Sequence, residues 1–346
     1  METWPLLLSA EQAHAKDALL ITQRDDNFEE STNMTIRKLL QFVVLGLGLA
    51  FMGGARAADT INPFVLASQS KGDFMSKVQD VEAALKSAGF QLLGSYSPDM
   101  AKYHPYQAAT VLAVTSPALQ AAAAKTPRGG YGAVLSVSVT QVDGQLQVAY
   151  MNPVYMSYAY RMKTDLQPVL DTLGKALGDE KTFGSNGMKP QDVENYHYTF
   201  GMEYFDEPMK LNSYGSHAQA VAAVKKALEA GKGGTKFVYQ LDVPGTDQTV
   251  FGVGLDSQSD NNVNDAYLMS VVDFKDLRRT AYLPYQILVK GKQVEALNLR
   301  FRMAVFFPEL SMMGQHSFMT LMSAPDAIKN ALTKVAGGSS SGSSFY

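Results

Sequence analysis

Cysteine is missing from this chain of 346 residues, and tryptophan and histidine are scarce, with one and five copies. Without a thiol the protein forms no disulfide bond, and thiolate nucleophiles and cysteine redox chemistry are excluded. Its fold must therefore depend on hydrophobic cores, and the length suffices for two of ordinary size. The few histidines show no H-x-H or H-E-x-x-H spacing, so a zinc enzyme is not expected.

An excess of charge of either sign is also missing. The whole chain carries 30 Lys or Arg and 33 Asp or Glu, and residues 58–346 carry 25 and 26. Such a balance gives no long-range attraction to nucleic acid or to anionic lipid. We therefore expect neither as a partner.

Residues 34–57 have the three parts of a secretory signal peptide. Arg37 and Lys38 precede an apolar run from Leu39 to Phe51, and Ala55-Arg56-Ala57 follows as a small-x-small cleavage pattern. The run has 13 residues, whereas a transmembrane helix needs about 20. We predict cleavage directly after this pattern, no stable membrane anchor afterwards, and a periplasmic or secreted mature protein.

The stretch before the signal peptide is expected to lie outside the protein. Signal peptides begin at the initiator, so Met34 is the expected start and residues 1–33 an over-called extension. The only tryptophan, Trp4, lies in this extension. No cysteine follows the apolar run, which excludes a lipoprotein anchor.

The rest of the chain predicts an α+β fold in two units, residues 58–178 and 196–336. A linker at 179–195 joins them, and a flexible tail follows at 337–346. In the first unit we expect strands at 64–67, 90–96, 110–114, 134–142 and 146–151, and helices at 73–86, 116–124 and 165–177.

The second unit repeats this order of chain breakers and apolar runs. We expect a helix that begins at Ser216, strands at 237–241, 249–255, 282–289 and 294–306, and helices at 264–278 and 325–335. Residues 110–114 align with 249–253, Gly89 with Gly231, and Pro153 with Pro308. Chance similarity of short motifs is the alternative to a true tandem repeat.

Three stretches of the first unit carry a family resemblance: DVEAALKSAGFQLLGSY (80–96), ATVLAV (109–114) and VLSVSVTQVDGQLQVAYMNP (134–153). Their helix, glycine, strands, hairpin and final Asn-Pro resemble the family called domain of unknown function 302. The second unit is less similar, because Lys290-Gly291 and Phe307-Pro308 replace the Asp-Gly and Asn-Pro signals.

The resemblance implies a fold and no catalytic residues. It implies two tandem β-α-β(4)-α units similar to the TATA-binding-protein superfold, with antiparallel sheets backed by helices. A likeness of folds carries no expectation of DNA binding.

A methionine-rich stretch, SMMGQHSFMTLM (311–322), is a candidate for metal binding. Thioether and imidazole groups suit Cu(I), and an i, i+3, i+6 spacing would gather three of them on one side of a helix. Phe318 and Leu321 favour burial, and methionine is an adaptable core filler, so core packing without a metal is the default interpretation. The candidate ligands are Met312, Met313, His316, Met319 and Met322.

Other motifs resemble known sites only in part. The loop DSQSDNNVND (256–265) alternates oxygen-bearing side chains as calcium loops do, but it lacks their sixth-position glycine and twelfth-position glutamate. We interpret it as a solvated loop. The Gly-rich loop at 125–132 leads into a strand, which argues against a phosphate loop. No G-x-S-x-G elbow stands between a strand and a helix, and no paired carboxylates point to a hydrolase.

Aromatic residues are denser than a plain core requires, and they form two groups. One holds Tyr150, Tyr155, Tyr158 and Tyr160 with Arg161, and the other holds Tyr196, Tyr198, Phe200, Tyr204 and Phe205. Tyrosine is favoured where one side of a residue is apolar and the other wet. These residues are expected to line the contact between the two units, with an external ligand site as the alternative.

These observations predict an exported, soluble binding or interaction protein without evident catalytic machinery or cofactor. Its partner would be an unknown protein or small molecule. The first alternative is a periplasmic copper or haem handling protein with Met and His ligands, and the second is a hydrolase with an unrecognised site. The ligand-binding candidates are Tyr150, Tyr155, Tyr158, Tyr160, Arg161, Tyr196, Tyr198 and Tyr204.

Overall fold

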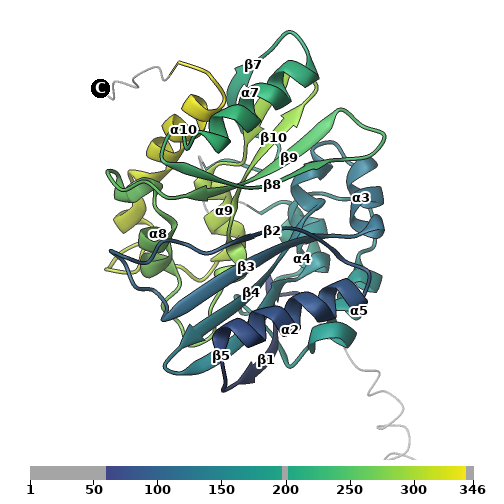
Figure 1. The fold of residues 1–346 in the computed structure, drawn as a ribbon, viewed down its shortest axis with the longest axis vertical. Helices are drawn as coiled ribbons and strands as arrows, with labels where there is room; N and C mark the ends of the chain where they lie inside the picture. The colour runs from purple at the N-terminus through teal and green to yellow at the C-terminus, as the bar shows by residue number, and fades with distance from the viewer. Residues whose placement is uncertain (1–59, 197–201, 340–346) are drawn as a thin grey trace, which may run out of the picture. The chain divides into compact units, whose positions relative to one another are not determined.

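The computed structural model describes residues 60–196 and 202–339 (Figure 1). The expected signal peptide, Tyr198, Phe200 and the end of the tail lie outside these residues. The described chain is a mixed α+β fold with two antiparallel sheets, as the sequence predicts. No helix in the described ranges is long and apolar enough to cross a membrane.

We call residues 60–196 the first half and residues 202–339 the second half. The first half contains β1 (Phe64–Ser70), α2 (Phe74–Ser87), β2 (Gln91–Tyr96), β3 (Ala108–Thr115), α3 (Pro117–Ala124), the 3-10 helix η1 (Gly129–Gly132), β4 (Leu135–Val142), β5 (Gln145–Met151), α4 (Pro153–Ala159), α5 (Gln167–Leu177), β6 (Lys181–Phe183) and α6 (Pro190–Glu194).

The second half contains β7 (Met209–Ser213), α7 (His217–Glu229), β8 (Thr235–Asp242), β9 (Gln248–Leu255), η2 (Asn261–Val263), α8 (Asp265–Val272), η3 (Thr280–Tyr282), β10 (Tyr285–Lys290), β11 (Gln293–Ala296), α9 (Leu299–Phe306), η4 (Met319–Leu321) and α10 (Ala324–Val335).

The two sheets have the same strand order. The first runs β2-β3-β4-β5-β1-β6 and the second β8-β9-β10-β11-β7, so each strand from β1 to β5 has a counterpart from β7 to β11. Helices α2 and α5 cover the first sheet, and α7 and α10 cover the second (Figure 1). The similarity to the TATA-binding-protein superfold remains a prediction.

Local sequence signals account for most of these elements. The side chains of Asp73, Ser116 and Ser216 each accept a backbone hydrogen bond at the start of a helix, as capping residues do. Asp143 and Gly144 have φ angles of 50° and 73°, which the tight turn between β4 and β5 requires.

An asparagine begins the helix after the hairpin in both halves. Asn152 Oδ1 accepts hydrogen bonds from the backbone N–H groups of Val154 and Tyr155, at 3.0 and 3.4 Å. Asn298 Oδ1 accepts one from Arg300 N–H at 2.9 Å. The counterpart of Asn152-Pro153 is thus Asn298-Leu299, and the alignment of Pro153 with Pro308 was wrong, because Pro308 follows the helix α9.

Three further expectations need correction. The strand expected at 294–306 ends at Ala296, and residues 299–306 form α9, because Asn298 caps a buried helix there. The helix expected at 264–278 ends at Val272. The linker expected at 179–195 contains β6, which pairs with β1, and α6.

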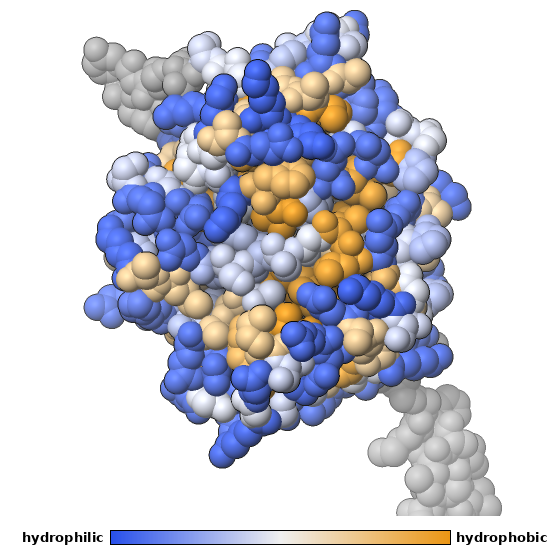
Figure 2. Space-filling view, viewed as in Figure 1, coloured by the Kyte–Doolittle hydropathy of each residue, from blue (hydrophilic) through white to orange (hydrophobic). Residues whose placement is uncertain are grey.

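The halves meet where the edge strands β2 and β8 lie side by side (Figure 1). Two glycines permit this contact: a Cβ on Gly94 would lie 2.3 Å from the carbonyl oxygen of Val238, and one on Gly254 would lie 2.4 Å from the ring of Tyr96. On the face in Figure 2, apolar residues form an interrupted band over this junction. Buried residues of both halves belong to one hydrophobic core cluster.

Candidate functional site

A cleft of about 870 Å³ lies between helix α10, the turn before β8 and the loop after β9. Most of its lining residues carry a hydroxyl, amide, carboxylate or ammonium group. The lining consists of Gly233, Gly234, Asp256, Ser257, Gln258, Ser259, Asp260, Val263, Ala327, Asn330, Ala331 and Lys334.

A glycine pair holds the walls of the cleft close together. Gly233 and Gly234 both have φ of +72°, a conformation that favours glycine. A Cβ on Gly233 would lie 2.6 Å from the carbonyl oxygen of Ala331 in α10, and one on Gly234 would lie 2.6 Å from Cβ of Ser257. Helix α10 and the loop after β9 therefore both rest on this turn.

The loop after β9 is fixed by its own polar groups. Ser257 N–H donates to the Val263 carbonyl at 3.0 Å, and Ser257 Oγ accepts from Asp260 N–H at 3.1 Å. Asn264 Nδ2 donates to the Ser257 carbonyl at 3.2 Å. The sequence marked this loop by its alternating oxygen side chains, which we interpreted as solvated. The structure shows that several of these side chains line the cleft.

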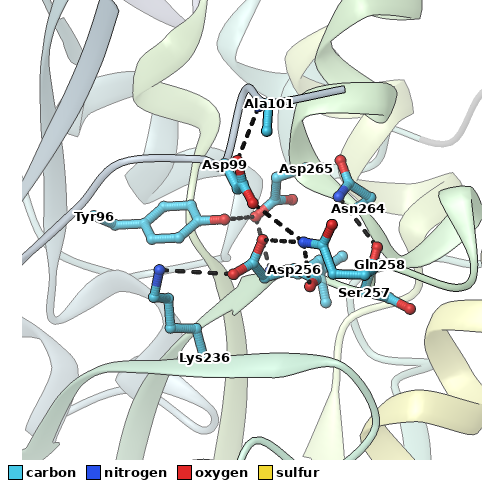
Figure 3. A network of polar contacts seen from close by, with 10 residues as sticks. Tyr96, Asp99, Ala101, Lys236, Asp256, Ser257, Gln258, Asn264 and Asp265 are labelled. Carbon is cyan, nitrogen blue, oxygen red and sulfur yellow. Dashed lines mark hydrogen bonds and ion pairs between the residues drawn. The ribbon is translucent and has the colours of Figure 1, made fainter. Parts of the chain in front are cut away.

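Polar groups from the first half reach this loop (Figure 3). Gln258 Nε2 donates to Asp99 Oδ2 at 3.2 Å, and Lys102 Nζ donates to Asn261 Oδ1 at 3.0 Å. On the other side, Lys236 Nζ lies 3.6 Å from Asp256 Oδ2. The loop is therefore braced from two directions.

A buried carboxyl group lies behind the loop, at the first residue of α8. Asp265 Oδ2 accepts hydrogen bonds from the hydroxyl of Tyr96 and from Leu255 N–H, both at 2.9 Å (Figure 3). The pKa of the Asp265 carboxyl is raised to about 7, mainly by burial and also by the charge of Asp256, while the two hydrogen bonds oppose the shift. A strongly shifted carboxyl next to a cleft is a common feature of functional sites.

Sequence reasoning did not single out this pair. Tyr96 and Asp265 are separated by 169 positions. Each ends a stretch that the sequence marked, 80–96 and 256–265, but neither stretch indicates a contact with the other. The start of α8 agrees with the helix expected from residue 264, because the Asn264 side chain accepts a hydrogen bond from Tyr267 N–H as a cap. Nothing local could have indicated that a tyrosine of the first half would cover that helix start.

The first tyrosine group is divided by the structure between the core and the surface. Tyr155 donates its hydroxyl to the Val305 carbonyl at 2.6 Å, across the two halves. Tyr160 stacks on Phe205 with ring centroids 5.6 Å apart, and Tyr150 donates to the Gly178 carbonyl at 3.2 Å. These three rings are buried and cannot contact an external ligand without rearrangement.

Tyr158 and Arg161 do come together, in a second cleft of about 390 Å³. Arg161 Nη1 lies 2.9 Å from Asp206 Oδ2, and its Nε donates to the Glu194 carbonyl at 3.1 Å. The guanidinium is thus already engaged by the protein. Tyr196 packs against the core as a half-buried residue, and Tyr204 is also half-buried.

The methionine-rich stretch departs from its default interpretation. Core packing was wrong for its four methionines, which are 38, 78, 49 and 63% exposed at Met312, Met313, Met319 and Met322. Residues 311–318 form no helix. His316 Nδ1 lies 2.8 Å from the Val271 carbonyl, and its ring stacks on Phe274 with centroids 4.2 Å apart.

Other metal and hydrolase candidates find little support. In residues 60–196 and 202–339, no three His, Asp or Glu side chains gather as a metal site. His217 Nε2 lies 3.3 Å from Thr249 Oγ1, which donates to Asp242 at 2.6 Å. Thr249 is fully buried, so its hydroxyl is not open to a substrate.

Comparisons with protein-family models, curated proteins and solved structures find no match to this chain. The resemblance to the domain of unknown function 302 therefore stays a prediction that depends on the stretches at 80–96, 109–114 and 134–153. A function has to be argued from the geometry of the clefts and side chains.

Proposed function

We propose that this protein is an exported binding protein that takes a small, hydroxyl-rich ligand in the cleft between α10 and residues 256–263. The observation that carries the proposal is the convergence of polar side chains on one cleft from the loop after β9 and from α10. Hydroxyl, amide and carboxylate groups together can both donate to and accept from ligand hydroxyls.

The lining also limits the class of ligand. Asp256 and Asp260 place two carboxylates against the single ammonium of Lys334, which disfavours anions and favours neutral or cationic molecules. The lining residues include no aromatic ring, so a planar aromatic ligand would find no stacking partner. Polyols, sugars and amino sugars fit this set of groups.

Pre-organisation supports the same proposal. The glycine turn, the hydrogen bonds of Ser257 and the contacts from Asp99 and Lys102 hold the loop before any ligand arrives. A rigid site loses less conformational entropy on binding, which helps a small ligand reach useful affinity.

The binding test uses three probes: myo-inositol, glucose and glucosamine, each titrated into the protein with saturation-transfer NMR as the readout. We expect at least one to bind with a Kd below about 10 mM. Asn330→Leu should weaken that binding at least tenfold, because it replaces a lining amide. Lys329→Leu changes the preceding residue of α10, which is outside the lining, and this variant should bind as the unchanged protein does. Equal binding by both variants, or no binding by any probe, would overturn the proposal.

Export is tested separately by the mass of protein recovered from a Gram-negative host. Residues 34–57 support cleavage after Ala57, so the recovered chain should begin at Ala58 and contain no tryptophan. A cytosolic product that keeps these residues would contradict export while leaving the cleft proposal standing.

A further inference from the structure

Four of the exposed large apolar side chains lie within eleven residues, at Met312, Met313, Met319 and Met322. We propose that these methionines and His316 form a binding site for a soft monovalent metal ion, Cu(I). This site is separate from the cleft and does not depend on the proposed function.

The backbone of the stretch brings these residues together. Phe318 N–H donates to the Ser311 carbonyl at 3.0 Å, and Met319 N–H donates to the Met312 carbonyl at 3.2 Å. Met322 N–H donates to the Met319 carbonyl at 3.3 Å. Met312 and Met319 are therefore backbone neighbours, although seven positions separate them in sequence, and His316 lies inside the loop that they close.

Side-chain hydrogen bonds fix the same loop. Thr320 Oγ1 donates to the carbonyls of Gly314 and Gln315, at 2.9 and 3.0 Å. Ser317 Oγ donates to the Gly314 carbonyl at 2.7 Å. The thioether side chains thus project from an ordered loop, and ordered support of this kind holds ligands in place.

His316 is oriented as a metal ligand would be. Its Nδ1 lies 2.8 Å from the Val271 carbonyl, which can only accept, so Nδ1 donates there and Nε2 is the ring nitrogen left for a metal. The ring of Phe274 holds the imidazole plane, with an interplanar angle of 27°. A backbone carbonyl on the second ring nitrogen is the usual support of metal-ligating histidine.

The ligand chemistry selects the ion. Thioether and imidazole groups are soft or borderline donors that suit Cu(I), whereas calcium and magnesium need oxygen ligands. Residues 311–323 contain no Asp, Glu, Lys or Arg, and the chain has no cysteine to compete for the metal. A surface that docks another protein would also expose methionine side chains. Docking alone, however, does not explain why the imidazole of His316 is held in one orientation.

The main test is a competition for Cu(I) between the full chain and the chromophoric chelator bathocuproine disulfonate, under anaerobic reducing conditions. We expect the protein to retain one Cu(I) per chain. Replacing all four methionines by leucine keeps their size and should lower the affinity at least 100-fold, and His316→Gln should lower it at least tenfold. Met75→Leu is the matched control, because Met75 is 58% exposed on α2 and should leave the affinity unchanged.

A second readout does not depend on chelator strength. With methyl-labelled methionine, Ag(I) as a spectroscopic substitute should shift the resonances of Met312, Met313, Met319 and Met322 and leave Met75 in place. A protein that leaves all Cu(I) with the chelator would overturn the proposal, as would a fourfold variant that binds like the unchanged chain. If the unchanged chain retains no Cu(I) but self-associates, and the fourfold variant does not self-associate, the stretch would be a protein-docking surface instead. Asn330→Leu, in the cleft, should bind Cu(I) normally.

Discussion

The hydroxyl of Tyr96 donates a hydrogen bond to Asp265 Oδ2 at the first residue of α8, and the hydroxyl of Tyr106 donates to Asp273 Oδ2 at its end. Between them, the ring of Tyr103 packs on Tyr267 with centroids 5.0 Å apart. The connection from β2 to β3 therefore runs along α8 and holds it at both ends. Because α8 follows the cleft loop, this contact also fixes the cleft relative to the first half.

The buried carboxyl group of Asp265 should make stability depend on pH. Its pKa rises from 3.8 to about 7 on folding, so the folded state binds an extra proton between these values. The associated stability is fully present below about pH 4 and is lost as the pH rises through 7, a fall of about 4 kcal/mol in the free energy of unfolding. Burial also raises the pKa of Asp273, which acts in the same direction.

Urea unfolding at pH 5, 6, 7 and 8 measures this dependence. Asp265→Asn should flatten the slope, because the amide cannot ionise. Asp171→Asn, exposed on α5, should keep the slope of the unchanged protein. Parallel curves for the unchanged protein and Asp265→Asn would show that this carboxyl does not titrate as inferred.

Removal of the Tyr96 hydroxyl should weaken the hold on α8. Asp265 Oδ2 accepts from Tyr96 and from Leu255 N–H, and Tyr96→Phe leaves only the bond from Leu255 N–H. We expect a loss of about 1 kcal/mol at pH 5, where the carboxyl is neutral, and about 2 kcal/mol at pH 8, where it is charged. Tyr103→Phe, in the same loop, should cost less, since its ring contact remains. If Tyr96→Phe lowers the free energy of unfolding equally at pH 5 and pH 8, the hydrogen bond is not strengthened by the charge of Asp265.

Local signals predicted most elements of the fold, because caps, glycines and turns act over a few residues. Asp73, Ser216 and the Asp143-Gly144 turn are examples. Residues 299–306 were misassigned as a strand because Arg300 and Arg302 alternate with apolar residues from Leu299 to Met303, the two-residue period of a strand, although the segment forms a helix. Only Asn298 distinguished the two, and its cap was overlooked in favour of Pro308.

The candidate sites were less accessible to sequence reasoning. The cleft loop at 256–265 and the methionine stretch at 311–322 were both noticed, but their exposure depends on how α8 and α10 pack. The Tyr96–Asp265 pair joins residues from different halves, and no pattern within either half encodes it. Tertiary contacts of this kind determine how deeply the Asp265 carboxyl is buried, and therefore how far its pKa is raised.

The helix caps after the two hairpins should contribute equally. Asn152→Ala and Asn298→Ala each remove a side-chain acceptor from a helix start, and we expect each to lower the free energy of unfolding by about 1 kcal/mol. Pro308→Ala, which follows α9, should cost less than either. Chemical denaturation of the three variants gives the comparison. A larger loss for Pro308→Ala than for Asn298→Ala would favour the alignment of Pro153 with Pro308.

Close approach of β2 and β8 should make Gly94 intolerant of a side chain. Gly94→Ala would place a Cβ 2.3 Å from the Val238 carbonyl, and the backbones must separate by about 1 Å to relieve the contact. We expect a loss of about 2 kcal/mol in the free energy of unfolding. Gly215→Ala is the control, because its Cβ would meet only the flexible end of Gln219. If the two variants have the same free energy of unfolding, strands β2 and β8 can separate at no cost in stability.

A buried arginine in α9 is held between two tyrosine rings. The guanidinium of Arg302 lies between the rings of Tyr282 and Tyr285, 4.4 and 4.1 Å from their centroids. Its Nη2 donates to the carbonyls of Tyr282 and Pro284, at 2.9 and 3.2 Å. Arg302→Lys keeps the charge but loses the planar group that stacks on two rings while bonding two carbonyls. We expect a loss of about 2 to 4 kcal/mol, because two buried carbonyls lose their donor.

Arg300→Lys on the same helix is the matched control. Arg300 Nη1 lies 3.0 Å from Glu203 Oε1 in a half-exposed ion pair, and such pairs contribute little, so we expect a change within about 0.5 kcal/mol. Near-ultraviolet circular dichroism adds a direct readout, because its tyrosine signal should change in Arg302→Lys and persist in Arg300→Lys. If both variants unfold at the same urea concentration with unchanged spectra, the stacked arginine does not stabilise the core as its geometry implies.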